Sequence, residues 1–221
     1  MVADYTKREE IFQKMNRYFL ILYLIITMIS CYINLVNRDF YNLLQAILGL
    51  FILILPMIIY KISEFKLTSD VKFLFYFFSF CTQILGSSLS LYKYFPLWDK
   101  IVHFASGILI TMIGFILFHI LLHKKGEISK DNGLLSLIFC QNFNISIAAL
   151  WEVYEYLLFV FFKIDAVNAL TKGIHDSLQD MMVCMLGGFL ILFCLIPYIY
   201  RGKQSFLTKT YEHLLSSNGY L

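Results

Sequence analysis

Charged residues are scarce in this chain of 221 residues. Asp, Glu, Lys and Arg make up 15% of it, against about 25% in ordinary soluble domains. Proline is represented by three residues, and no low-complexity tract, internal repeat or long polar linker interrupts the sequence. Hydrophobic residues account for 59% and aromatic residues for 18%. This composition excludes an ordinary soluble domain and indicates a single helical bundle embedded in a membrane.

Two further classes are disfavoured by what is missing. The five cysteines lie inside apolar runs, and no Cys-x-x-Cys motif occurs, so we expect no disulfide framework. The net charge is only +3, and the basic residues fall in short loops between apolar runs. Topology explains basic residues in such loops, so we expect no nucleic-acid partner.

Six apolar runs are long enough to cross a bilayer, which takes a helix of about 20 residues. We expect spans near 18–36, 41–60, 71–92, 99–122, 134–162 and 176–200. The first run is too long for the apolar part of a signal peptide and lacks a small-x-small cleavage site, so we interpret it as a transmembrane helix. The sequence therefore predicts an all-α polytopic bundle of about six spans over residues 18–200.

The lysines and arginines predict the orientation of this bundle. Thirteen of the 18 fall on the side of both chain ends, and five fall on the other side: Arg38, Lys93, Lys100, Lys163 and Lys172. By the positive-inside rule, segments 1–17 and 201–221 are expected to be cytoplasmic.

Three motifs set ionisable side chains three or four residues apart, on one face of a helix. They are Asp99 with His103, Glu152 with Glu155, and Asp176 with Asp180. Ionisable residues inside apolar spans are rare and mark a functional site by default. In the predicted orientation all three pairs lie in the outer half of the membrane. We therefore expect them to meet in one outward-facing polar pocket between the last three spans.

Carboxylates and an imidazole on facing helices resemble the ligands of metal sites in helical bundles. We expect a divalent metal ion there, either Zn²⁺, Mn²⁺ or Mg²⁺, because oxygen and imidazole ligands suit these ions. The predicted ligands are His103, Glu152, Asp176 and Asp180. Glu155 or Asp99 would then act as general base, or Asp99 would orient His103. For Asp99 and Asp176, a simple helix-capping role is the alternative.

Three other residues are candidates for contacts with a substrate. His175 stands at the expected mouth of the pocket, where it would bind an anionic head group. Asn144 lies on the same helix stripe as Glu152, and Trp151 lies beside it. An interfacial aromatic that packs in the membrane belt is the simpler interpretation of Trp151.

The order of these motifs resembles the YjdF-like family of bacterial inner-membrane proteins, and more distantly the VanZ-like family. The resemblance rests on Asp99–Phe104 with Gly107, on Trp151-Glu152 with Glu155, and on Asp176–Met181 with Gly187. It covers about the last 125 residues. It implies a multi-pass inner-membrane protein. The distant VanZ-like link to glycopeptide resistance implies chemistry on an outer-leaflet lipid or cell-envelope precursor.

The leading hypothesis is a metal-dependent hydrolase or transferase whose partner is a membrane lipid or lipid-linked substrate. One alternative is a proton- or cation-coupled transporter, in which the carboxylates form a relay. Against this alternative, the polar residues stop in the outer half of the membrane. A through-path would need them to continue to the cytoplasmic side, and only Gln141, Asn142 and Asn144 point that way. Another alternative is a non-catalytic binding or immunity protein. The sequence leaves the reaction, the substrate and the oligomeric state open.

Overall fold

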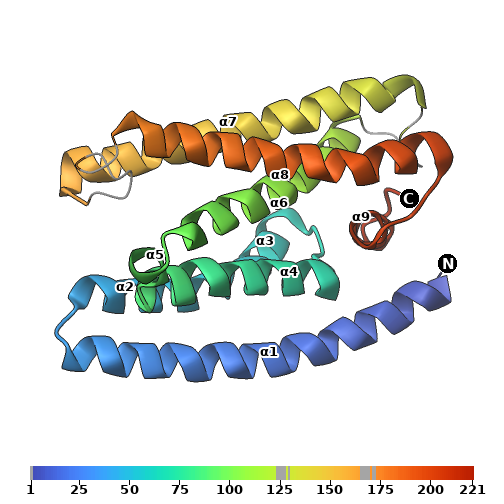
Figure 1. Cartoon of the computed structure of the whole chain (residues 1–221). Coiled ribbons are helices and arrows are strands. Elements are labelled where there is room, and N and C mark those ends of the chain that lie inside the picture. Colours follow the sequence, from blue (N-terminus) through green and yellow to red (C-terminus); the bar gives the residue numbers. More distant parts are fainter. Residues whose placement is uncertain (1, 123–127, 129, 165–169, 171–172) are drawn as a thin grey trace. The chain divides into compact units, whose positions relative to one another are not determined.

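The computed structural model describes residues 2–122, 128, 130–164, 170 and 173–221. Among these residues the regular structure is helical and includes no strand, which confirms the predicted all-α class (Figure 1). The elements are α1 (Val2–Val36), α2 (Phe40–Ile52), α3 (Leu55–Ser63), α4 (Ser69–Ser79), the π-helix η1 (Phe80–Ser88), α5 (Leu91–Tyr94), α6 (Leu97–Leu121), α7 (Lys130–Phe162), α8 (Ile174–Arg201) and α9 (Phe206–Ser217).

The chain divides into two compact units. The first comprises Met1–Trp98 and Glu212–Gly219, and the second comprises Asp99–Tyr211 and Tyr220–Leu221. Three of the lysines that predict the orientation lie outside the described residues: Lys124, Lys125 and Lys172.

The predicted number of spans is too high. Over the described residues, α1, α6, α7 and α8 are long and apolar enough to cross a membrane, and the bent pair α2 and α3 makes a fifth span if it is counted as one. The two helices of this pair meet at 41°, just before Pro56 in the first turn of α3. Proline cannot continue the hydrogen-bond ladder of a preceding helix, which accounts for the position of the bend.

The missing sixth span is the predicted segment 71–92. There the chain forms α4 followed by η1, and neither is long enough to span on its own. A wide turn closes η1, in which the Leu89 amide donates to the carbonyl of Ile84 at 2.8 Å. Hydropathy averaged over a window cannot distinguish this change of helix type from one continuous α-helix.

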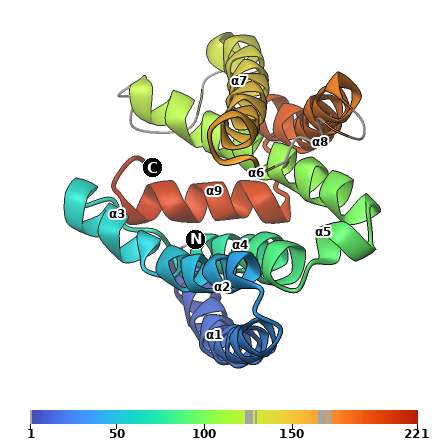
Figure 2. The same cartoon turned by 90° about the vertical axis from the view of Figure 1, so that its left-hand side faces the viewer.

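The first unit is joined by buried hydroxyl groups as well as by apolar packing. Tyr23 of α1 is fully buried against Phe80 and Ile84 of η1. Its hydroxyl lies 3.1 Å from both the Gly49 carbonyl of α2 and the Ser79 hydroxyl of α4. One side chain therefore ties three helices together, and Figure 2 shows α1, α2 and α4 lying side by side.

In the second unit, α6 and α8 approach through glycines. A Cβ atom on Gly107 would overlap the Cys184 carbonyl, and one on Gly187 would overlap the Phe104 carbonyl. Gly114 makes a similar approach to Cys140 of α7. Small residues allow membrane helices to pack backbone to backbone. This packing fixes the positions of the helices that carry the three predicted motifs.

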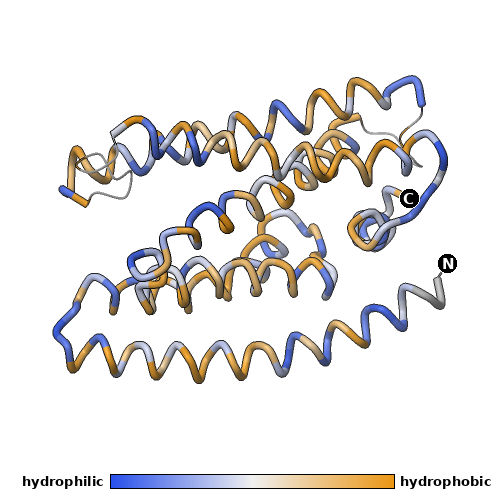
Figure 3. The backbone as a smooth tube through the Cα atoms, in the orientation of Figure 1, coloured by the Kyte–Doolittle hydropathy of each residue, from blue (hydrophilic) through white to orange (hydrophobic). Residues whose placement is uncertain are grey.

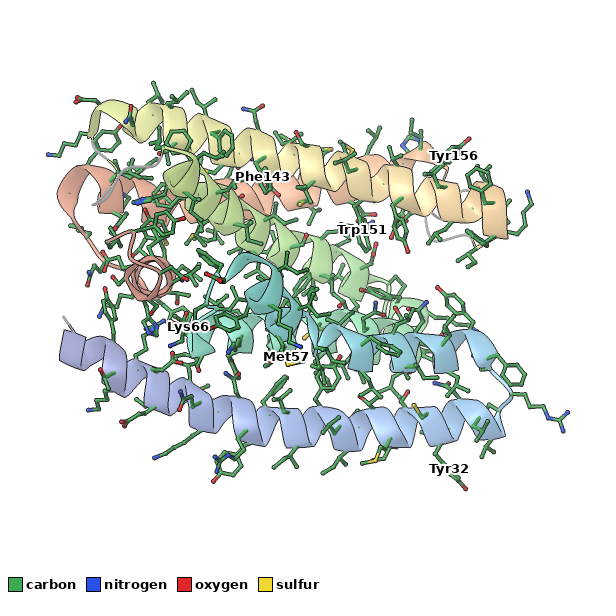
Figure 4. All side chains as sticks on the ribbon, turned by 180° about the vertical axis from the view of Figure 1, so that it is seen from behind. Tyr32, Met57, Lys66, Phe143, Trp151 and Tyr156 are labelled. Atoms are coloured by element: carbon green, nitrogen blue, oxygen red, sulfur yellow. The ribbon has the colours of Figure 1, made fainter. Side chains whose placement is uncertain are left out.

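The outer surfaces of the long helices are apolar. Figure 3 shows predominantly hydrophobic tubes with hydrophilic turns and helix ends. Large side chains such as Tyr32, Phe161 and Phe193 are at least 70% exposed, and Figure 4 shows Tyr32 pointing away from α1. Continuous exposed apolar surface is unfavourable in water, so these faces suit a lipid environment.

Candidate functional site

The first turns of α6 and α8 bring acidic side chains into the second unit. Asp99 lies in the first turn of α6, and Asp176 lies in the first turn of α8. The amino-terminal end of a helix carries partial positive charge, which favours an acid at both positions. Asp180 follows one turn later on the same face of α8 as Asp176. The side chains of Asp176 and Asp180 are only 2% and 4% exposed.

Lys100 holds these acids together. Its Nζ atom lies 2.6 Å from Asp180 Oδ1, 2.8 Å from Asp176 Oδ1 and 3.1 Å from Asp99 Oδ2. The lysine side chain is itself 19% exposed. An ammonium group has three donors, so each of its hydrogens can go to a different carboxylate. The cluster therefore carries an internal cation.

His103 completes a group of metal-compatible donors. Its Nε2 atom lies 3.6 Å from Asp99 Oδ1 and 3.8 Å from Asp180 Oδ1. One ligand atom from each of these three residues lies within 4.8 Å of the other two. Donors bound to one ion at about 2.0–2.2 Å lie up to about 4 Å apart, so shifts of less than an ångström would let the three share an ion. The donor set fits Zn²⁺ or Mn²⁺.

Glu152 of α7 faces the same cluster. It is 8% exposed, and its charge interacts with those of Asp180, His103 and Asp99. Ser177 of α8 provides a hydrogen bond to its carboxyl group. Its Oε2 atom is buried and has no hydrogen-bond partner among the residues that the structure describes. A buried carboxylate oxygen without a partner is costly, so this one favours a proton, a water or a cation beside it.

Glu155 is held by its own helix. The indole Nε1 of Trp151 donates to Glu155 Oε1 at 2.9 Å, one turn away along α7. Trp151 is half exposed, and Figure 4 labels it on α7 with Phe143 and Tyr156. Glu155 also interacts electrostatically with Glu152, Asp99 and Asp180. Trp151 thus fixes the position of a carboxylate beside the cluster.

The predicted residues are brought together in part. Asp99, His103, Asp176 and Asp180 meet around Lys100, and Glu152 and Glu155 lie within electrostatic range. The two other substrate-contact candidates lie apart. His175 is exposed. Asn144 is fully buried eight residues from Glu152, about 12 Å along the helix, where it bonds Cys184.

Lys100 is the member that the sequence prediction missed. The orientation prediction treats Lys100 as one of the loop lysines, because it stands near the expected end of a span. Its spacing of three residues from His103 places both on one face of α6. A lysine inside an apolar helix, on the face that carries an acid and a histidine, is the signal that could have identified it.

A second buried polar cluster lies in the first unit. Asp70 is fully buried and accepts from Arg8 Nε and Thr68 Oγ1, both at 2.6 Å, and lies 3.2 Å from His213 Nδ1. Burial raises the pKa of Asp70, but the hydrogen bonds from His213, Thr68 and Arg8 outweigh it and lower that pKa to about 2. A cavity of about 430 Å³ adjoins this cluster and is lined by polar residues including Glu9, Lys66 and His213.

Comparison with known proteins identifies the family of this chain. The family described as "Predicted membrane protein (DUF2238)" matches residues 16–201. The chain belongs to this family. The YjdF-like resemblance is to this same family and is confirmed. A protein of Thermotoga maritima described as "Uncharacterized protein" is 26% identical over 148 residues, or 67% of this chain and 71% of the relative. No solved structure matches.

Proposed function

We propose that this DUF2238-family protein binds a divalent cation at Asp99, His103 and Asp180 and acts as a hydrolase or transferase on a lipid-linked substrate. The observation that carries the proposal is the convergence of three ligand atoms, from two helices, within 4.8 Å of one another. The buried, unpaired Oε2 atom of Glu152 beside them supports it, because such an atom calls for a cation or a proton.

Each side chain of the site has a separate role in the proposed reaction. Asp99, His103 and Asp180 hold the ion, which when bound polarises a phosphoryl or carbonyl oxygen and activates a water. Glu152 takes a proton at its free Oε2 atom as general base. Glu155, oriented by the indole of Trp151, lies within electrostatic range of Glu152. Asp176 holds Lys100 to one side of the site.

Lys100 sets the affinity for the ion. Asp180 Oδ1 accepts from Lys100 at 2.6 Å and also lies 3.8 Å from His103 Nε2. An ammonium group and a divalent cation therefore compete for the same oxygen. Lys100 keeps the acids neutralised in the absence of the ion and must turn toward Asp176 when the ion binds.

The substrate class follows from the proposed location. The starts of α6 and α8 face the outside of the inner membrane if α1, α6, α7 and α8 are the spans and both termini are cytoplasmic. A site within the first turns of these helices is about 5–10 Å deep, which is the level of lipid head groups. Lipid-linked phosphates and envelope precursors of the outer leaflet present their reactive groups there.

Metal titration of the purified protein tests the proposal. We expect the wild type to bind one Mn²⁺ or Zn²⁺ per chain in calorimetry, and Asp180→Asn and His103→Gln to lose this binding. Asp131→Asn changes an exposed acid in the first turn of α7 and serves as the matched control. Binding that survives in Asp180→Asn refutes the assigned ligands. Phosphate release from a lipid diphosphate in vesicles, with and without the bound ion, then tests the reaction.

A proton- or cation-coupled transporter is the second candidate function. The observation that favours it is the Lys100 ammonium among three acids, because exchangeable ion pairs of this kind occur in membrane relays. Under this hypothesis Lys100→Gln abolishes flux of H⁺ or Na⁺ into proteoliposomes, and metal removal has no effect. Flux that is unaffected by Lys100→Gln excludes this second function.

A further inference from the structure

Midway along α8, polar side chains from two neighbouring helices surround Gly188. A Cβ atom at this position would lie 2.5 Å from Gln141 Oε1 and 2.8 Å from Thr111 Oγ1, and would overlap Asn144 Nδ2. Thr111 belongs to α6, and Gln141 and Asn144 belong to α7. Because Gly188 has no side chain, these polar atoms can converge on the backbone of α8.

The hydrogen bonds of this group can be assigned atom by atom. Asn144 Nδ2 donates to the Cys184 carbonyl at 3.1 Å, and Asn144 Oδ1 accepts from Cys184 Sγ at 3.1 Å, which fixes the orientation of the amide. Gln141 Nε2 donates to the Met185 carbonyl at 3.3 Å. An amide nitrogen has two hydrogens, so Asn144 keeps one that is not used in these contacts.

Two buried oxygens of the group, Gln141 Oε1 and Thr111 Oγ1, make no hydrogen bond to any part of the chain that the structure describes. Thr111 is fully buried, and Gln141 is 7% exposed. Inside a membrane helix bundle, lipid offers no substitute partner for such atoms. Buried polar groups that lack a protein partner are commonly satisfied by an internal water that makes about three hydrogen bonds.

We propose that Thr111, Gln141 and Asn144 bind a buried water molecule beside Gly188. The water donates to Gln141 Oε1 and Thr111 Oγ1 and accepts from the remaining hydrogen of Asn144 Nδ2. The two oxygens are no farther apart than the sum of their distances to the Cβ position, which one water can bridge by hydrogen bonds of about 2.8 Å. The amide hydrogen of Asn144 favours neutral water over a metal cation.

This water site continues, along α8, the polar groups of the carboxylate cluster, which is formed by Asp99, Asp176 and Asp180 around Lys100. Gly188 lies two turns from Asp180, about 12 Å along the helix. Cys184 lies between them, where it bonds Asn144 and lies 3.6 Å from the Ser106 hydroxyl. Water held beside Gly188 would therefore mark a polar track that leads inward from the cluster. The proposal does not depend on a cation at Asp99, His103 and Asp180.

The sign of one stability change tests the water site. If the Thr111 hydroxyl bonds a water, Thr111→Val lowers the thermal midpoint of the purified full chain, by about 2–4 °C for one lost hydrogen bond. If that hydroxyl is dry, removing an unpaired polar group leaves the midpoint unchanged or raises it, which overturns the proposal. Thr27→Val is the matched control. It makes the same substitution at an equally buried hydroxyl, which donates to the Tyr23 carbonyl of its own helix.

A labelling experiment detects the water itself. X-ray pulses make hydroxyl radicals from bound water, and these oxidise adjacent thiols. We expect the double variant Thr111→Val/Gln141→Leu to reduce oxidation of Cys184 at least twofold and to leave that of Cys194 unchanged. Equal oxidation of Cys184 in wild type and variant overturns the proposal. A stabilisation by Na⁺ over choline that Thr111→Val removes would assign the site to a cation and would also overturn it.

Discussion

Replacing Lys100 by methionine removes the cation at the centre of the carboxylate cluster and keeps most of the side-chain volume. In the native chain the Nζ atom lies within 3.1 Å of oxygens from Asp99, Asp176 and Asp180. Asp176 and Asp180 have almost no access to solvent. Removing one partner of a buried ion pair costs about 3–5 kcal/mol, because the remaining charge is uncompensated.

The expected loss can be measured as a thermal midpoint. For a chain of this size, about 1 kcal/mol corresponds to about 2–4 °C, so Lys100→Met in EDTA should unfold roughly 6–20 °C below wild type. A divalent cation should reverse much of this loss. At one hundred times its dissociation constant, a bound ion contributes about 2.7 kcal/mol, and in the variant it no longer competes with the ammonium for Asp180 Oδ1.

Two controls separate the charge from the side chain. Lys100→Arg keeps the cation and should lose much less stability, whereas Lys130→Met removes an exposed lysine and should lose none. If Lys100→Met is as stable as wild type in EDTA, Lys100 does not neutralise the acids and the reasoning fails. A clear loss of stability in Lys100→Met that no divalent cation reverses would support the ion pairs of Lys100 and refute the metal site.

Three other expectations concern the fold. Gly187→Ala places a methyl group on the Phe104 carbonyl and should cost about 3 kcal/mol of stability, measured by thermal unfolding. Gly133→Ala is the control and should cost less, because its methyl group meets side-chain atoms of Ile199 and Tyr200 and no backbone atom is among its three nearest neighbours. The pKa of Asp70 is lower in the folded chain than its value of 3.8 in the unfolded chain, so Asp70 contributes stability above pH 3.8 that is lost as the pH falls toward 2. The loss should be about 2 kcal/mol. Asp70→Asn should abolish this pH dependence of the unfolding free energy. Tyr23→Phe removes hydrogen bonds to Gly49 and Ser79 and should cost about 1–2 kcal/mol in denaturant unfolding, whereas the exposed Tyr32→Phe should cost nothing measurable.

Local patterns in the sequence predicted part of this structure well. A spacing of four residues placed Asp99 with His103 and Asp176 with Asp180 on common helix faces. The helices that carry these pairs, α6 and α8, approach at Gly107 and Gly187, each of which lies against a carbonyl of the other helix. These predictions work because a helical period relates residues that are close in the chain.

Other features depend on partners that no local pattern reveals. Asp70 meets Arg8 and His213 across 62 and 143 positions of sequence, so nothing near Asp70 indicates its partners. The predicted span 71–92 covers both α4 and the π-helical η1, and the change of helix type between them leaves no signal in hydropathy, which is why six spans were predicted. Lys100 was missed for a different reason, because its charge served as a topology signal and was not also considered as a counter-ion.

Comparison of two buried acids in this chain separates a structural role from a functional one. Asp70 accepts hydrogen bonds from Arg8, Thr68 and the Val71 amide, so each of its oxygens has a partner. Such a carboxylate needs no ligand to explain its burial. Glu152 is nearly as buried, yet its Oε2 atom has no partner within the described ranges of the chain, and it faces other acids. Burying a charge in this way is costly unless a proton or cation arrives. The carboxylate cluster of the second unit, and not the paired cluster of the first, is therefore where we place function.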